Sequence, residues 1–277
     1  MRPALLAALL ALAATAALAP PLRSASPPPP GDDPAPAHDA FTISSRVLGE
    51  TRPVNVHVPA GYRGCPTKRF PVLYMPDGGL DEDFPHVVRT VDSLVARRAI
   101  RPVIVVGIPN TERRRDLTGP TRVAADSAVA PRVGGSAAFR RFLGDELVPA
   151  IRARYRTTEE RAIVGESFAG LFVLETFLLE PGLFDHYVAL DPSLWWNGGA
   201  LLDSAQARLA SLGPARRTIY FACADVPEMA AATARFAELL GAVPKRKLAW
   251  EYAPRPDLTH ATIFRAVEAK ALASALR

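Results

Sequence analysis

One short stretch of the chain is built around a candidate nucleophile, Ser167. The stretch Arg161–Glu175 reads RAIVGESFAGLFVLE. Its apolar start predicts a buried strand and its apolar end predicts a helix. The small residues Gly165, Ala169 and Gly170 permit a very tight turn between the two. We expect Ser167, at the apex, to have a strained backbone and an exposed hydroxyl, which is the arrangement of a nucleophilic serine with Ala169 where glycine is more usual.

A serine hydroxyl attacks only when a base removes its proton and an acid orients that base. In a strand-turn-helix setting of this kind, the acid and then the histidine follow the serine along the chain. The histidines are His38, His57, His86, His186 and His260. His186 abuts the next strand and leaves no strand between to carry an acid, whereas His260 follows the last predicted strand. We therefore predict that His260 is the base.

The acid is expected where a strand ends at the same edge of the sheet. Asp225 directly follows the predicted strand Thr218–Cys223 and is the first candidate. Glu228 is the second, although the first turn of a helix also favours an acidic residue for structural reasons. Asp191, after the preceding strand, and Asp257, in the histidine loop, stay open as alternatives. A dyad without an acid is a further one.

Acyl transfer also needs two amide donors for the developing oxyanion. The N–H of Phe168, directly after the nucleophile, is one predicted donor. The turn Pro76–Gly79 (PDGG) follows an earlier strand and lets the backbone approach a ligand closely. Gly79 is the second predicted donor, with its neighbour Leu80 as the alternative.

The wider pattern is one of apolar strands alternating with amphipathic helices. Two alternating segments, Phe41–Val47 and Val54–Val58, predict an opening antiparallel hairpin. The later predicted strands are Phe70–Met75, Val103–Ile108, the strand before Ser167, His186–Leu190, Thr218–Cys223 and Leu248–Tyr252. The predicted helices are Phe84–Arg98, Ser136–Tyr155, a helix from Phe168 to about Leu179, Ala200–Leu212, Glu228–Leu240 and one from Ala261.

This order of elements predicts an α/β fold. Buried strands that alternate with helices require a mostly parallel sheet with helices on both faces. An opening antiparallel hairpin, with the nucleophile on the third parallel strand, is the layout of the α/β-hydrolase fold.

The beginning of the chain differs from the rest. Residues 1–19 place Arg2 before a Leu/Ala run and end in small residues, which indicates a signal peptide; an uncleaved anchor helix is the alternative. Residues 20–37 are rich in proline and predict an extended spacer. The catalytic domain is expected over 38–277, in a periplasmic or secreted protein with no membrane span after signal cleavage.

Composition excludes several classes of function. The formal net charge is +5, but the basic residues are spread along the chain, so no nucleic-acid partner is expected. No spacing typical of metal ligands occurs, so we expect no metal. Cys65 and Cys223 allow one disulfide at most, and the sequence leaves their pairing open. It also leaves the oligomeric state open.

Several motifs together resemble a known family, the esterase D-like and enterochelin-type siderophore esterase branch of the α/β-hydrolases. They are YMPDGG, GIPNTERRRDLT, FLGDELVPAIRARYRT, GESFAGLF and LDPSLWWN, and the similarity runs from about Phe41 to the end. The chain departs from the family pattern with Glu166 where histidine is common, Ala169 where glycine is common, and Asp191 where serine often stands.

The resemblance implies hydrolysis of a small carboxylic ester without a cofactor. It places the nucleophile on Ser167, the base on His260 and the oxyanion turn on Asp77–Gly79. Trp195 and Trp196 are predicted to line the substrate pocket, with a role as a loop anchor as the alternative. Arg113, Arg114 and Arg115 suit an acidic or catecholate ester, or a structural pair with Asp116. An acyltransferase and a non-catalytic binding protein are the rival functions.

Overall fold

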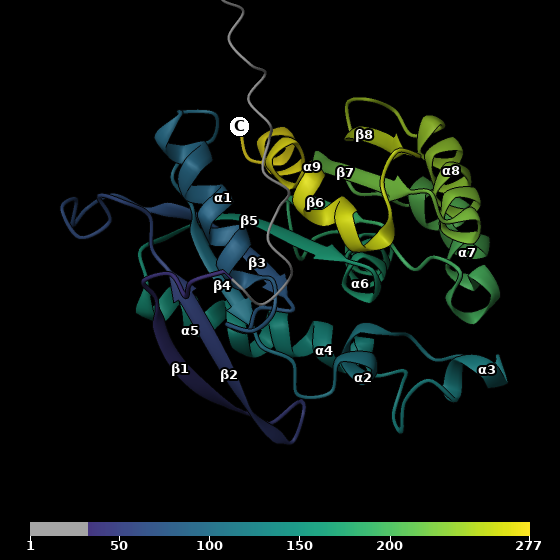
Figure 1. Ribbon diagram of the computed structural model, residues 1–277, viewed down its shortest axis with the longest axis horizontal. Coiled ribbons are helices and arrows are strands. Elements are labelled where there is room, and N and C mark those ends of the chain that lie inside the picture. The colour runs from purple at the N-terminus through teal and green to yellow at the C-terminus, as the bar shows by residue number, and fades with distance from the viewer. Residues whose placement is uncertain (1–32) are drawn as a thin grey trace, which may run out of the picture.

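The computed structural model describes residues 33–277, and an eight-stranded sheet runs through them (Figure 1). Its strand order is β1-β2-β4-β3-β5-β6-β7-β8. β2 pairs antiparallel with β1 and β4, and all later neighbours pair in parallel. The strands are β1 (Asp39–Ser45), β2 (Glu50–His57), β3 (Phe70–Pro76), β4 (Ile104–Ile108), β5 (Thr157–Glu166), β6 (His186–Leu190), β7 (Arg217–Ala224) and β8 (Leu248–Arg255). The predicted mostly parallel sheet with an antiparallel start is confirmed.

Helices cover both faces of this sheet (Figure 1). One face packs against α1 (Phe84–Ala96) and α9 (His260–Ala275), and the other packs against the remaining long helices. Those are α4 (Ser136–Arg141), α5 (Val148–Arg154), α6 (Phe168–Leu179), α7 (Ala200–Ala210) and α8 (Pro227–Gly241). Shorter segments are α2 (Arg113–Leu117), α3 (Ala124–Ser127), the π-helical turn η1 (Phe142–Leu147) and the 3-10 turn η2 (Trp196–Gly199).

The alternation of side chains along β3 shows why two helical layers are needed. Leu73 and Met75 belong to the core under α1 and α9, whereas Val72 and Tyr74 belong to the core on the opposite face. Successive side chains of a strand point to opposite faces, and all four are buried. A strand that is apolar on both sides is stable only when both sides are covered.

Most predicted elements are present, with shifted ends. The predicted helix Ser136–Tyr155 is a continuous helical stretch over α4, η1 and α5, with a π turn in its middle. The last strand runs to Arg255, and α9 already begins at His260. The polar loop after β4 contains two short helices, α2 and α3, which its sequence pattern did not predict.

The predicted signal peptide (1–19) lies outside the described residues, as does most of the spacer (20–37). Within residues 33–277, no helix combines the length and the apolar composition that a membrane crossing requires.

The turn after β3 brings two strand ends into very close contact at Gly78. The Gly78 N–H donates to the carbonyl of Ile108 at 3.1 Å, and Asn55 Nδ2 donates to the Gly78 carbonyl at 2.9 Å. A Cβ at Gly78 would lie 2.1 Å from Ile108 N and 2.3 Å from Gly107 Cα. Only glycine fits at this position, because the neighbours that a methyl group would meet are backbone atoms.

We therefore expect Gly78→Ala to lower the free energy of unfolding by about 3 kcal/mol, since the β4 backbone must shift to admit the methyl group. The midpoint of denaturant unfolding measures the effect. Gly241→Ala is the matched control, because a Cβ there meets nothing within 4 Å. A Gly78→Ala protein as stable as the control would contradict this account of the turn.

Candidate active site

Three neighbouring strands end at one edge of the sheet in residues with the same unusual backbone. β3, β5 and β6 are followed directly by Asp77 (φ 56°), Ser167 (φ 60°) and Asp191 (φ 44°). A positive φ is unfavourable for residues with a side chain, and such strain gathers at functional sites. Since β3, β5 and β6 are adjacent in the sheet, the three residues lie along one stretch of its edge.

The backbone around Ser167 has the tight turn that its sequence predicts. Ser167 has φ 60° and ψ −120°, and its N–H donates to the carbonyl of Leu190 at 3.0 Å. A Cβ at Gly165 would lie 2.7 Å from the Cβ of Ala169, and one at Gly170 would lie 2.9 Å from the carbonyl oxygen of Leu190. The turn thus needs glycine at two positions but accepts the alanine at 169.

His260 reaches this edge from the start of α9 and is bonded to Asp191. Its Nδ1 donates to Asp191 Oδ2 at 2.5 Å. The Asp191 side chain is fully buried, whereas that of His260 is 43% exposed. The Asp191 hydrogen bond raises the pKa of His260 above its ordinary value, against the opposing effect of burial. Thr259 and Thr262 form a capping box that fixes the beginning of the helix and so the position of His260.

The second oxygen of Asp191 is held by the end of β7. Asp191 Oδ1 accepts a hydrogen bond from the N–H of Ala224 at 3.0 Å and one from Cys223 Sγ at 3.2 Å. Burial, and then the Asp191 hydrogen bond, raise the pKa of Cys223 to about 12, so its thiol keeps the proton that it donates. Burial opposes ionisation of Asp191, but its hydrogen bonds from His260, Ala224 and Cys223 outweigh this and lower the pKa of its carboxyl.

The prediction that Asp225 orients His260 is wrong in this structure. The Asp225 side chain is exposed and bonds to nothing within residues 33–277, although its N–H donates to the carbonyl of Leu258 at 3.0 Å. Glu228 is also exposed, and Asp257 is bonded to Arg255. The acid that meets His260 is Asp191.

The physical reason lies in the order of the strands. β6 lies directly beside β5, whereas β7 is one strand further from Ser167. The positive φ after β6 places the Asp191 carboxylate against the end of β7, at the point where His260 arrives. The available sequence signal was an aspartate directly after the strand that follows Ser167.

The two predicted oxyanion donors differ in whether their N–H already has an acceptor. Phe168 is the first residue of α6, so its N–H has no acceptor within the helix. The N–H of Gly79 instead donates to Glu82 Oε2 at 2.7 Å. Asn110 Nδ2 holds the other oxygen of Glu82 at 2.7 Å. In this conformation, therefore, the Gly79 N–H is already bonded to the Glu82 carboxylate.

The two tryptophans differ in their surroundings. Trp196 is buried, and its indole N–H donates to the carbonyl of Gly119 at 2.8 Å, which makes it an anchor for its loop. Trp195 is partly exposed. Its ring lies 5.8 Å from that of Phe168, the residue directly after Ser167. Only Trp195 therefore keeps a face that a substrate can reach.

Arg113 connects two of the strained strand ends. Its guanidinium forms two hydrogen bonds to Asp77, at 2.7 and 2.8 Å, and a longer contact of 3.4 Å to the carbonyl of Glu166. It also lies 5.9 Å from the ring of Phe168. The arginine thus neutralises Asp77 and borders the site at Ser167.

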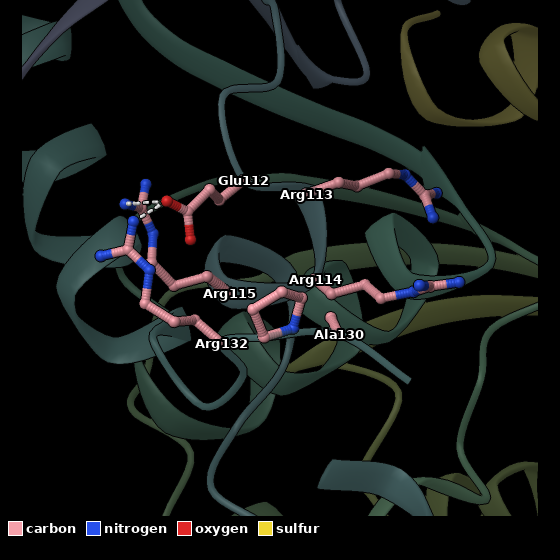
Figure 2. A pocket seen from close by; sticks show the side chains of 7 residues that line it. Glu112, Arg113, Arg114, Arg115, Ala130 and Arg132 are labelled. Atoms are coloured by element: carbon pink, nitrogen blue, oxygen red, sulfur yellow. Dashed lines mark ion pairs between the residues drawn. The ribbon is translucent and has the colours of Figure 1, made fainter. Parts of the chain in front are cut away.

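A pocket of about 510 Å³ opens next to Arg113 (Figure 2). Its lining residues are Glu112, Arg113, Arg114, Arg115, Ala130, Pro131 and Arg132. Arg115 and Arg132 form ion pairs with Glu112. Arg115 also pairs with Asp116, as one reading of the sequence expected. Arg114 is exposed, and within residues 33–277 it has no carboxylate partner and donates only to the carbonyl of Val129. Arg113, Arg115 and Arg132 are each paired with a carboxylate, Arg115 also with Glu50, so the uncompensated positive charge of the lining is that of Arg114.

Comparison with known proteins identifies relatives of this chain. The model of the family described as "Putative esterase" matches residues 45–260. Ferri-bacillibactin esterase BesA of Bacillus subtilis is 30% identical over 176 residues, which are 58% of this chain and 60% of BesA. The siderophore triacetylfusarinine C esterase of Aspergillus fumigatus is 30% identical over 193 residues, 63% of this chain and 62% of that protein. The matches thus span about three fifths of each relative.

A solved structure supports the same relationship. The IroE-like serine hydrolase of Shewanella oneidensis superposes with a TM-score of 0.77 at 26% sequence identity. The superposition covers 86% of this chain and 79% of the other. The shared region takes in most of the described fold.

The contact between His260 and Asp191 can be tested without an activity assay. In a histidine NMR titration, we expect Asp191→Asn to lower the pKa of His260, because the carboxylate is the main group that raises it. Asp225→Asn should leave this pKa unchanged, since Asp225 is exposed and has no contact with the ring. If the Asp225 variant alone lowered the pKa, the assignment of Asp191 would be wrong.

Proposed function

This chain belongs to the Esterase family, and on that premise we propose that it hydrolyses carboxylic esters through an acyl-enzyme on Ser167. The observation that carries the proposal is the 2.5 Å hydrogen bond between His260 and the buried Asp191, at the sheet edge where Ser167 stands in a strained turn. A buried carboxylate that orients an imidazole near a serine is the arrangement that activates the hydroxyl.

In the proposed reaction, Nε2 of His260 takes the hydroxyl proton as Ser167 Oγ bonds to the ester carbonyl carbon. Asp191 stays ionised and stabilises the imidazolium. The tetrahedral intermediate then collapses, His260 returns the proton to the leaving alcohol, and the acyl group stays on Ser167. Water, deprotonated by His260, releases the acid in the second half of the cycle.

The oxyanion would be held by the amides of Phe168 and Gly79. The Phe168 N–H has no acceptor in its helix, which suits it to this role. For Gly79 to take part, its N–H must exchange the carboxylate of Glu82 for the substrate oxygen, because the two compete for one donor. Glu82 thus acts as a stand-in for the oxyanion in the free protein.

The pocket beside Arg113 supports a substrate with acidic groups. Its positive charge favours an anionic ester, and Arg114 is the arginine best able to pair with one. The relatives named as siderophore esterases make iron-chelating esters the first candidates. Trp195 would provide an apolar wall near the nucleophile. We also propose export to the periplasm or the medium, for which the composition of residues 1–37 is the support.

The serine is tested by hydrolysis of short nitrophenyl esters. We expect Ser167→Ala to lower kcat by about 10⁴-fold or more, and Asp191→Asn to lower it by a factor on the order of 10³ to 10⁴. Asp225→Asn is the matched control and should retain full activity. Activity should also fall as the pH drops through the raised pKa of His260, since an imidazolium cannot accept the proton. Undiminished turnover by Ser167→Ala would contradict the proposal.

The role of Arg114 is tested with a pair of esters that differ only in charge. Arg114→Gln should raise KM for an ester with an acidic acyl group by about tenfold and leave KM for its neutral analogue unchanged, because only the first loses an ion pair. Arg101→Gln is a suitable control, since Arg101 is half-exposed and paired with Glu160, which lies at the opposite end of β5 from Ser167. Equal effects on both esters would contradict the proposed role.

A further inference from the structure

Glu166 is a half-buried acid directly before Ser167, and the proposed reaction does not use it. It ends β5, and its side chain is only partly accessible to solvent. Its Oε1 is inaccessible to solvent and has no hydrogen-bond partner within residues 33–277. A buried polar atom without a partner is costly and calls for an explanation.

The basic side chains near Glu166 are hydrogen-bonded to other carboxylates. Arg113 forms its two short hydrogen bonds with Asp77 and contacts only the backbone carbonyl of Glu166, at 3.4 Å. His260 donates its Nδ1 proton to Asp191. Within the described part of the chain, no donor is thus bonded to the Glu166 side chain.

Acidic groups face Glu166 from three other segments. Asp77 follows β3, Asp83 precedes α1, and Asp191 follows β6, and each acts against its ionisation. The opposing charges are those of His260 on α9 and Arg113 on α2. Burial, with these carboxylates, raises the pKa of Glu166 to about 8. The geometry and the charges therefore agree that the carboxyl holds a proton at neutral pH.

We propose that Glu166 determines the charge selectivity of the site: protonated, it admits anionic esters beside Ser167, and ionised, it repels them. The inference rests on the proposed esterase function. The carboxylates of Asp77, Asp83 and Asp191 already face Glu166, and Arg113 is held by the first of them. One more negative charge next to the nucleophile must weaken the binding of an anionic substrate much more than that of a neutral one.

The test compares two nitrophenyl esters of equal size, one with a neutral acyl chain and one with a terminal carboxylate, between about pH 6 and about pH 9.5. In the wild-type protein, the ratio of KM for the anionic ester to KM for the neutral ester should rise on the order of tenfold as the pH passes through the Glu166 pKa of about 8. In Glu166→Gln, the ratio should stay at its low-pH value throughout.

Asp225→Asn is the matched control, because it removes an exposed carboxylate at the end of β7, two strands from β5, and should keep the wild-type rise. A constant ratio in the wild-type protein would overturn the proposal, and so would a rise that persists in Glu166→Gln. Parallel changes in kcat for both esters, with no change in the KM ratio, would indicate a purely structural residue and would also overturn it.

A second measurement is independent of catalysis. Because the folded-state pKa of Glu166 is raised, the stability that its protonated form contributes is present below about pH 4.5 and is lost as the pH rises through about 8. Glu166→Gln should therefore gain thermal stability relative to the wild-type protein over that range. If Glu166→Gln gains no thermal stability, the carboxyl of Glu166 is not protonated in the folded wild-type protein over that range. A gain in a protein that hydrolyses no ester would refute the esterase function and leave the protonation state intact.

Discussion

The backbone strain at the ends of β3, β5 and β6 is the constraint on which the rest of the site depends. A positive φ at Asp77, Ser167 and Asp191 costs on the order of 1 to 3 kcal/mol at each residue. The chain can sustain it because the three strands are fixed in one parallel sheet, under helices on both faces. The same backbone conformation recurs at three adjacent strand ends and so gathers the candidate site residues at one edge of the sheet.

The site is also defined by how its charges are distributed. Arg113 is paired with Asp77, and His260 is hydrogen-bonded to Asp191, so the nearest basic side chains are already engaged. Within residues 33–277, Glu166 Oε1 has no donor, and the uncompensated arginine charge lies further out, in the pocket beside α2. Under the proposed function, such an arrangement would attract an anionic ester to the mouth of the site and keep the surroundings of Ser167 poor in free charge.

The fold and the tight turn at Ser167 could be predicted from sequence because local patterns determine them. Apolar runs gave the strands, and the small residues around Ser167 gave its turn. The acid could not be identified in this way, because Asp191 and Asp225 both directly follow strands. What distinguishes them is the lateral order of the strands and the backbone angle at Asp191, which come from tertiary packing. Three further features likewise depend on side-chain placement in three dimensions. They are the hydrogen bond from the Gly79 N–H to Glu82, the one from Cys223 to Asp191 and, within residues 33–277, the lack of a partner for Glu166 Oε1.

The central claim is that the folded chain activates Ser167 as a nucleophile. Reaction with an organofluorophosphonate, followed by mass spectrometry of the digested protein, tests it most directly, because this probe modifies only an activated serine. We expect one adduct per chain, on the peptide that contains Ser167, in folded protein and none after denaturation. An unlabelled folded protein, or an adduct on another serine, would show that Ser167 is not the activated serine.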